Sequence, residues 1–597
     1  MMPENRANQG PKGCGFLTQR PRVEVIRTPE TASAAQREFA RLAEAFVREE
    51  IFGKTALLEA QDLDARKETL KKSGEIGLLS AALPRPFGGA DADLSGCMRI
   101  AENLGHYPGW AANFSAQIST GILPLLFFGS AEQKATWLPK IGRGRAVVAY
   151  AISEAHSGSD ALAAKTVARE AADGRSYAVS GAKTWVPNAD IADVFIVFCQ
   201  INGTKFSAIL VERDRPGVTV GAPIETMGLR AAPVFPVEFD AVSVPAANVF
   251  GAVAKGHKVA FNTLNFERVE AAATSLGTCK RALMLAATYA KQRRQFGQPI
   301  SEFGAIRSKL ARMATRAWTL ESMCYRVAGA VDARLELLDA EADSYRVDAL
   351  GAIDEFAVEA AMIKVFGADA AVFLSAEALQ IYGSRGYESG CEVERIFRDA
   401  QASRISAGTN EINRMLIPSM ILKRTMKGQL HLFEMIEWML STLQEDDTKG
   451  DAFGPGQASG ERLALEGRLS EAAQKLVLYT LNQAIQKHMA DLREQQEILL
   501  DLADMTIALF AIDSTLLRTQ QVLAQGAGAE AALKHAATRL QISQSAQAIR
   551  QRAARLLNHL GADPAAVERF DLPVCIDEIA LERQIAEAVL RAESYPF

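Results

Sequence analysis

The order of hydrophobic and polar positions divides the chain into helical and strand-like stretches. Residues 31–145 repeat apolar side chains at helical spacing between Gly and Pro breaks, whereas residues 146–254 contain short β-rich runs separated by polar turns. These runs are Val147–Ile152, Tyr177–Val179, Val194–Phe198, Ser207–Val211 and Val237–Val244. Helical periodicity returns over residues 255–430. We therefore expect an α+β fold in which a β-domain is inserted between two helical domains.

Both ends of the chain extend this core. Residues 1–30 are polar with Gly and Pro, and we expect an irregular leader there. Residues 445–460 are charged and rich in Gly and Pro, which predicts a linker. Amphipathic helices follow to about Leu560 with a polar tail behind them, so residues 461–597 are expected to be an appended helical domain. Its helices either pack on the core, which we favour, or contact a membrane surface peripherally, against which their mixed charge argues.

The composition narrows the class of protein. Of the 597 residues, 48% are hydrophobic and 23% are charged, which is ordinary for a globular protein. The net charge of −5 includes no basic block, so nucleic acid is not an expected partner. The chain start lacks an apolar signal core and the seven cysteines form no CxxC pair, which favours the cytoplasm. The seven histidines form no HExxH motif, so no metal site is expected.

Two stretches in the β-rich region could hold a ring-containing anionic ligand. One reads Ile-Ser-Glu-Ala-His-Ser-Gly-Ser-Asp over residues 152–160, and the other reads Gly-Ala-Lys-Thr-Trp-Val-Pro-Asn-Ala over residues 181–189. Small residues and hydroxyls allow backbone N–H groups to approach an anion or a ring nitrogen closely. An indole plane can stack on a second ring and exclude water. Taken singly, such stretches are more often turns and core packing.

Three later stretches complete a pattern. Residues 289–300 read YAKQRRQFGQPI, residues 380–387 read QIYGSRGY, and residues 398–414 read RDAQASRISAGTNEINR. An Arg and an aromatic ring at a helix end can bind a pyrophosphate and cover a nucleoside. In this order the five stretches resemble the signature motifs of acyl-CoA dehydrogenases. The long C-terminal addition and the leader further resemble the very-long-chain type of that family.

The resemblance implies a fold, a cofactor and partners. The fold would be an N-terminal helical domain, a middle β-domain and a C-terminal four-helix-bundle domain, plus the appended helices. The cofactor would be FAD, the substrate an acyl-CoA, and the electron acceptor an electron-transfer flavoprotein. A homodimer is implied because the family takes one FAD-binding Arg and Phe from the neighbouring subunit. The implied cofactor-binding residues are Ser153, Ser159, Trp185, Arg293, Phe296, Gln380, Gly383, Thr409 and Glu411.

One departure concerns the catalytic base. The family's signature carries a Glu where this chain has Ala407, although the backbone N–H of Ala407 is retained to hold a thioester oxygen. Glu267 lies on a helical stripe with apolar residues, directly before Arg268, and resembles the alternative base position of isovaleryl-type members. We therefore assign Glu267 as the base, with Arg268 and Ala407 as substrate-binding residues. The alternative is that Glu267 has no catalytic role and only pairs with Arg268 or faces solvent.

The expected function is FAD-dependent α,β-dehydrogenation of an acyl-CoA thioester to the 2-enoyl thioester. A second hypothesis is a non-catalytic acyl-thioester- or FAD-binding or assembly protein on the same fold. It is motivated by Ala407, by Ser384 in place of a Gly, and by Pro187 in place of a hydroxyl residue expected to contact the flavin. A third is a flavin oxidase, whereas a nicotinamide dehydrogenase is disfavoured because no GxGxxG follows a strand. The Glu267 position suggests a short branched acyl chain and the C-terminal extension a long one.

Overall fold

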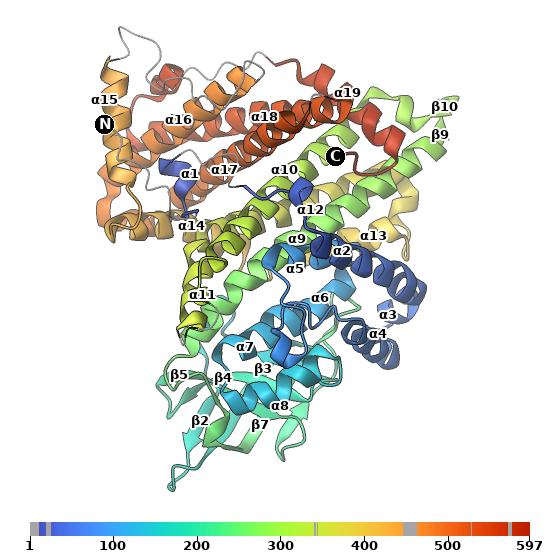
Figure 1. The fold of residues 1–597 in the computed structure, drawn as a ribbon, viewed down its shortest axis with the longest axis vertical. Coiled ribbons are helices and arrows are strands. Elements are labelled where there is room, and N and C mark those ends of the chain that lie inside the picture. The colour runs from blue at the N-terminus through green and yellow to red at the C-terminus, as the bar shows by residue number, and fades with distance from the viewer. Residues whose placement is uncertain are drawn as a thin grey trace.

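The computed structural model describes residues 11–19, 26–339, 342, 344–445, 463–526, 528–570 and 576–597. The linker predicted at 445–460 lies, apart from its first residue, outside the described residues. Within the predicted leader, Gly15–Thr18 form one helical turn, α1, whose Phe16 and Leu17 are buried. The predicted α+β architecture is confirmed, and its layers run from the appended helices through a helical core to the sheet (Figure 1).

The N-terminal helices lie beside the sheet and share one hydrophobic cluster with it (Figure 1). Asp62 and Asp93 cap α4 and α5 by accepting hydrogen bonds from backbone N–H groups in the first turn. The run Pro108–Phe128 is long and apolar enough by composition to cross a membrane, but most of it is buried, as in the core helix of a globular domain. The helices are α2 (Ala34–Phe46), α3 (Thr55–Glu59), α4 (Leu63–Glu75), α5 (Leu94–Leu104), α6 (Pro108–Gln117), α7 (Leu123–Phe128) and α8 (Ala131–Gly142).

The middle of the chain forms an eight-stranded sheet in the order β6-β7-β3-β2-β4-β5-β8, with β1 pairing to β4. Strand β4 alternates its faces: Ile196 and Phe198 pack with the N-terminal helices, whereas Phe195 and Val197 pack with β7. The strands are β1 (Val148–Ala151), β2 (Val167–Glu170), β3 (Ser176–Pro187), β4 (Val194–Ile201), β5 (Lys205–Glu212), β6 (Val218–Val220), β7 (Val234–Pro245) and β8 (Val249–Phe250).

Long helices follow the sheet and form the centre of the molecule (Figure 1). Helix α9 packs against α12, α10 and α5, so it contacts both the helical core and the N-terminal helices. The elements are α9 (Gly256–Gln292), β9 (Arg294–Gln295), β10 (Gln298–Pro299), α10 (Gly304–Leu335), α11 (Tyr345–Glu355), α12 (Ala357–Tyr382), α13 (Glu392–Ala402) and α14 (Asn410–Met426).

The appended helices lie across this core at the top of Figure 1. They are α16 (Ala464–His488), α17 (Gln496–Gln525), α18 (Ala529–Leu560) and α19 (Glu578–Ala592). Helix α15 (Leu432–Glu445), which precedes the linker, packs against α16. The expectation of a polar tail after Leu560 is wrong for α19. Its buried Leu581, Ile585 and Val589 recur every four residues, a narrow apolar stripe that flanking charges hide in the sequence.

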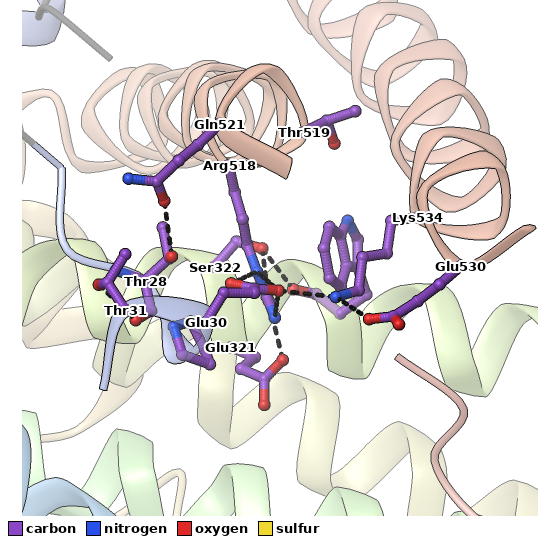
Figure 2. A network of polar contacts seen from close by, with 12 residues as sticks. Thr28, Glu30, Thr31, Glu321, Ser322, Arg518, Thr519, Gln521, Glu530 and Lys534 are labelled. Atoms are coloured by element: carbon purple, nitrogen blue, oxygen red, sulfur yellow. Dashed lines mark hydrogen bonds and ion pairs between the residues drawn. The ribbon is translucent and has the colours of Figure 1, made fainter. Parts of the chain in front are cut away.

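A buried charge network fixes the appended helices to the core (Figure 2). Arg518 of α17 is only 2% exposed in its side chain and contacts Glu321 of α10 and Glu30 of the leader, each at 2.8 Å. Its guanidinium also lies 3.7 Å from the ring centroid of Trp318. Lys534 of α18 reaches the same Glu30 at 3.0 Å. Four segments far apart in the sequence therefore meet at one set of paired charges.

Candidate active site

An ion pair joins the two loops of the β-domain singled out in the sequence. Lys183 of β3 is fully buried and its Nζ lies 2.8 Å from Oε1 of Glu154, which follows β1. Burial alone would raise the pKa of Glu154, but hydrogen bonds from Lys183 and Thr166 lower it to about 2. The backbone N–H of Thr184 also donates to the carbonyl of Ser153 at 3.0 Å. Ser153 is therefore anchored at the strand end.

Trp185 is held in an uncommon backbone conformation that turns its indole outward. Its φ is +57°, in the left-handed region, at a register break of β3 between Lys183 and Val186. The side chain is 55% exposed although the neighbouring Val186 is buried. The interpretation of Trp185 as simple core packing is therefore excluded. Ser159 is also exposed, in the loop after β1, so both side chains can meet a bound molecule.

The loop that carries Ala407 is tightly fixed. Ala407 and Gly408 both have positive φ, at +54° and +79°. The side-chain amide of Asn413 donates to the carbonyls of Ala407, Gly408 and Thr409 at 3.3, 2.9 and 3.0 Å. Nζ of Lys364 in α12 donates to the carbonyl of Gly408 at 2.7 Å. The Ala407 amide is thus positioned by partners on two helices.

Glu267 of α9 lies beside this loop. It is partly exposed, yet burial raises the pKa of its carboxyl, and the cations Arg268 and Lys364 together with a hydrogen bond from the backbone of Ala407 oppose that rise. The same environment lowers the pKa of the Lys364 ammonium to about 8, mainly through burial. The structure therefore brings together the carboxylate and the backbone N–H that the sequence had assigned to one site.

The side chain of Arg268 is directed toward Asn265, which argues against the alternative that Glu267 only pairs with Arg268. It is buried, and its guanidinium donates to Oδ1 of Asn265 at 2.9 Å. Among the described residues, its Nε has no hydrogen-bond partner. Burial lowers the pKa of Arg268 to about 10, while Glu267 opposes the shift. The positive charge of Arg268 therefore opposes the rise in the pKa of Glu267 electrostatically, without a direct hydrogen bond to it.

A separate cavity of about 590 Å³ lies at the far end of α9. Its lining includes Arg293, Gly383 and Arg385, and the β9–β10 hairpin beside it presents Phe296 with 93% of its side chain exposed. The volume falls within the range of small-molecule sites. Gln380 is exposed at the end of α12, next to the cavity residue Ile381. Thr409 caps α14 and accepts from the N–H of Ile412, and Glu411 is exposed in its first turn.

Comparison with known proteins identifies the family of this chain. Residues 33–145, 149–242 and 254–422 match the N-terminal, middle and C-terminal domains of acyl-CoA dehydrogenases. Residues 472–563 match a further acyl-CoA dehydrogenase C-terminal domain. The chain belongs to the acyl-CoA dehydrogenase family. This membership makes it an FAD-dependent acyl-CoA dehydrogenase.

Individual relatives agree with this assignment over nearly the whole chain. A probable acyl-CoA dehydrogenase of Bacillus subtilis is 33% identical over 590 residues, 98% of each chain. The rat mitochondrial very long-chain specific acyl-CoA dehydrogenase is 32% identical over 481 residues, which cover 77% of this chain and 71% of the relative. An acyl-CoA dehydrogenase of Bacillus anthracis, solved with FAD, superimposes with a TM-score of 0.94 at 33% identity, covering 98% and 100% of the two chains.

The residues of this acyl-CoA dehydrogenase fit FAD. The cavity beside Arg293 and Arg385 offers positive charge for a diphosphate, and Gly383, at φ +60°, leaves room for close backbone approach. The outward indole of Trp185 offers a plane for the flavin ring system. Among the described residues, no cluster of three or more His, Cys, Asp or Glu side chains is placed to hold a metal ion.

Four residues that support the site were not assigned roles from the sequence. Glu154 and Lys183 stood within the quoted motifs but gained a role only when the structure paired them. Asn413 lies near the end of the 398–414 motif, and its position four residues after Thr409 was the available signal for a loop-to-helix contact. Lys364 lies in the mostly apolar helix α12, and a lone cation in such a helix is only a weak signal in the sequence.

Proposed function

We propose that Glu267 is the catalytic base that removes the α-proton of an acyl-CoA, which leaves as the 2-enoyl thioester. The observation that carries the proposal is the position of Glu267 on α9 against the Ala407 loop: the adjacent Arg268 lies 4.0 Å from where a Cβ on Gly408 would be, and the backbone of Ala407 favours the ionised form of Glu267. A thioester oxygen accepting from that N–H would place its α carbon beside Glu267. Donors preorganised for a developing oxyanion are among the largest contributors to catalysis, and Asn413 and Lys364 hold this one in place.

The chain's own residues would divide the reaction as follows. The Ala407 amide binds the thioester oxygen and makes the α C–H bond more acidic. The carboxylate of Glu267 accepts the α-proton, and the charges of Arg268 and Lys364 oppose the rise in its pKa that burial causes. FAD, when bound, supplies the acceptor for the hydride of the β carbon. Trp185 shields one side of the flavin site from water.

The first test is anaerobic bleaching of the flavin by acyl-CoAs from short branched to long straight chains. Glu267→Gln should slow bleaching by about 10²- to 10⁴-fold while FAD stays bound. Glu44→Gln, an exposed carboxylate on α2, is the matched control and should bleach like the wild type. Bleaching by Glu267→Gln at the wild-type rate would refute the assignment of the base.

A swap of the base position sharpens this test. Ala407 already has a Cβ at φ +54°, so a Glu there adds little backbone strain. The double variant Ala407→Glu, Glu267→Gln should recover part of the lost rate, because it restores a carboxylate next to the same amide. If the double variant binds FAD normally but bleaches no faster than Glu267→Gln, a carboxylate at position 407 cannot accept the α-proton in this site.

We also propose a homodimer in which each FAD contacts both chains. Glu267 lies in α9 and Arg293 directly follows its last residue, so 26 residues at a helical rise of about 1.5 Å separate them by about 39 Å. That distance exceeds the length of an extended FAD molecule, so the Arg293 cavity and the Glu267 site of one chain serve different cofactors. The exposure of Phe296 supports a neighbouring subunit at the hairpin. Analytical ultracentrifugation of Phe296→Asp tests this point, and an unchanged dimer with full FAD would contradict it.

Electrons would pass from this dimer to an electron-transfer flavoprotein, as in the family. A cytoplasmic location is part of the proposal, supported by the six free thiols in the described part of the chain. Peripheral membrane contact by the appended helices stays the less favoured alternative.

The second candidate is a non-catalytic acyl-thioester- or FAD-binding or assembly protein. It is favoured by Pro187, which lies in β3 two residues after Trp185 and has neither a hydroxyl nor a backbone N–H to donate to a flavin. A flavin that stays oxidised with every acyl-CoA would select this candidate. Peroxide release in air during bleaching would instead indicate an oxidase.

A further inference from the structure

A second carboxyl, Glu270, lies next to the proposed base. It follows Glu267 by three residues on α9, so the two side chains occupy the same face of the helix. Glu270 is partly buried. Its surroundings connect it to the chemistry of Glu267.

The π-helical turn between α6 and α7 carries a hydrogen-bond partner of Glu270. Between α6 and α7, Ile118–Ile122 form a π-helical turn, a feature often found at functional sites. The turn passes close to β1, because a Cβ at Gly121 would lie 2.2 Å from Cγ1 of Val148. Ser119, buried within the turn, donates a hydrogen bond from Oγ to Oε2 of Glu270.

The groups facing Glu270 come from three elements besides α9. They are the hydroxyls of Ser115 in α6 and Ser119 in the π turn, and the thiol of Cys97 in α5. Burial raises the pKa of the Cys97 thiol far above its ordinary value, so this group is neutral. On α9 itself the neighbour is Glu267. Glu270 therefore meets hydroxyls, a neutral thiol and another acid.

The two cations of the site act on the other carboxyl. Arg268 and Lys364 favour the ionised form of Glu267, as does the backbone hydrogen bond from Ala407. When the two carboxyls hold one proton between them, it therefore belongs on Glu270. Burial raises the pKa of Glu270 to about 7, with Glu267 adding to the rise and the two serines opposing it.

We propose that Glu270 is a positioning residue for proton transfer: buried against α5, α6 and the π turn, and oriented by the hydrogen bond from Ser119, it holds a proton beside Glu267, and releasing that proton to solvent makes Glu267 the stronger base. The inference rests on the proposed function, because it takes Glu267 as the base. The α-proton of the substrate still goes to Glu267. Glu270 changes only how readily that carboxylate accepts it.

A pH dependence follows with a defined sign. Below about pH 7 Glu270 is neutral, and above it the second negative charge raises the proton affinity of Glu267. The rate of flavin reduction at saturating acyl-CoA should therefore rise by about three- to tenfold through neutral pH. Glu270→Gln should remove this rise. Ser119→Ala should move it to higher pH, because the lost hydrogen bond stabilised the ionised form of Glu270.

The experiment combines two readouts on the FAD-loaded protein. Infrared difference spectra between acid and alkaline pH report protonated carboxyl groups directly, without turnover, and rapid anaerobic mixing gives the pH profile of bleaching. Glu359→Gln is the matched control, since burial also raises the pKa of Glu359 to about 7 but it lies beside Cys14 of the leader. The expected result is a carboxyl band and a rate limb near neutral pH. Each of Glu270→Gln and Glu359→Gln should reduce the band by its own share, and only Glu270→Gln should remove the rate limb.

Several results would overturn the proposal. One is an infrared spectrum of Glu270→Gln identical to that of the wild type, and another is a lost band with an unchanged rate profile. Should Glu270→Gln fail to fold, an unshifted limb in Ser119→Ala decides against the proposal. If no acyl-CoA bleaches the wild type although the Glu270 band is present, the proposed function fails, and the catalytic role of Glu270 fails with it. The band distinguishes that outcome from a wrong assignment of the proton.

Discussion

Replacing Arg518 by Met should destabilise the protein by about 3 kcal/mol. Arg518→Met keeps an unbranched apolar stem beside Trp318 and removes the charge that pairs with Glu30 and Glu321 (Figure 2). Removing one partner of a buried ion pair generally costs about 3–5 kcal/mol, since the other charge is left desolvated. The low end applies because Glu30 keeps Lys534 as a partner, and Glu321 keeps its own contacts.

The pH dependence gives an independent check of this account. Burial would raise the pKa of Glu30, but Arg518 and Lys534 lower it to about 2, and the pKa of Glu321 is also lowered. A carboxyl whose folded pKa is depressed contributes stability above its ordinary pKa and loses it as the pH falls toward the folded value. The difference between wild type and Arg518→Met should therefore be full near neutrality and shrink below about pH 4.5.

Urea unfolding followed by tryptophan fluorescence measures both effects, with FAD at the same excess for each variant so that ligand binding contributes equally. Arg591→Met is the control, because its side chain is 77% exposed and its pair with Glu587 should contribute less than about 0.5 kcal/mol. A loss of stability in Arg518→Met no larger than in this control would refute the reasoning. So would a difference that grows on acidification.

Two further predictions concern the site. Asn413→Ala removes the amide that fixes the carbonyls of residues 407–409, so we expect flavin reduction by acyl-CoA to slow on the order of 10²-fold with bound FAD unchanged; equal rates in stopped-flow mixing would contradict this. Glu154→Gln leaves the buried Lys183 without its ion pair, so FAD content after dialysis should fall and the unfolding free energy should decrease by about 3 kcal/mol. Full FAD retention and unchanged stability would show that the pair does not hold the two loops.

Much of the fold follows from local patterns in the sequence. The change from helical to alternating periodicity near residue 146 marks the sheet, because a strand exposes alternate residues and a helix does not. The α19 stripe escaped notice, since three apolar residues among charges acquire meaning only when a neighbouring helix covers them. The π turn at Ile118–Ile122 likewise has no local sequence signal that distinguishes it from ordinary helix.

For the site, too, the sequence determined one part and the tertiary structure another. The resemblance of the motifs to those of acyl-CoA dehydrogenases implied FAD, the absence of the usual Glu at position 407 and the replacement candidate Glu267, because a resemblance depends only on which side chains are present. Only the tertiary structure showed that α9 lies against the Ala407 loop, that Arg268 donates to Asn265, and that Arg293 follows the end of α9, far from Glu267. Burial and electrostatic environment arise from residues distant in the chain. The protonation behaviour of Glu267 and Glu270 could therefore be read only after folding had brought α5, the π turn and α12 around α9.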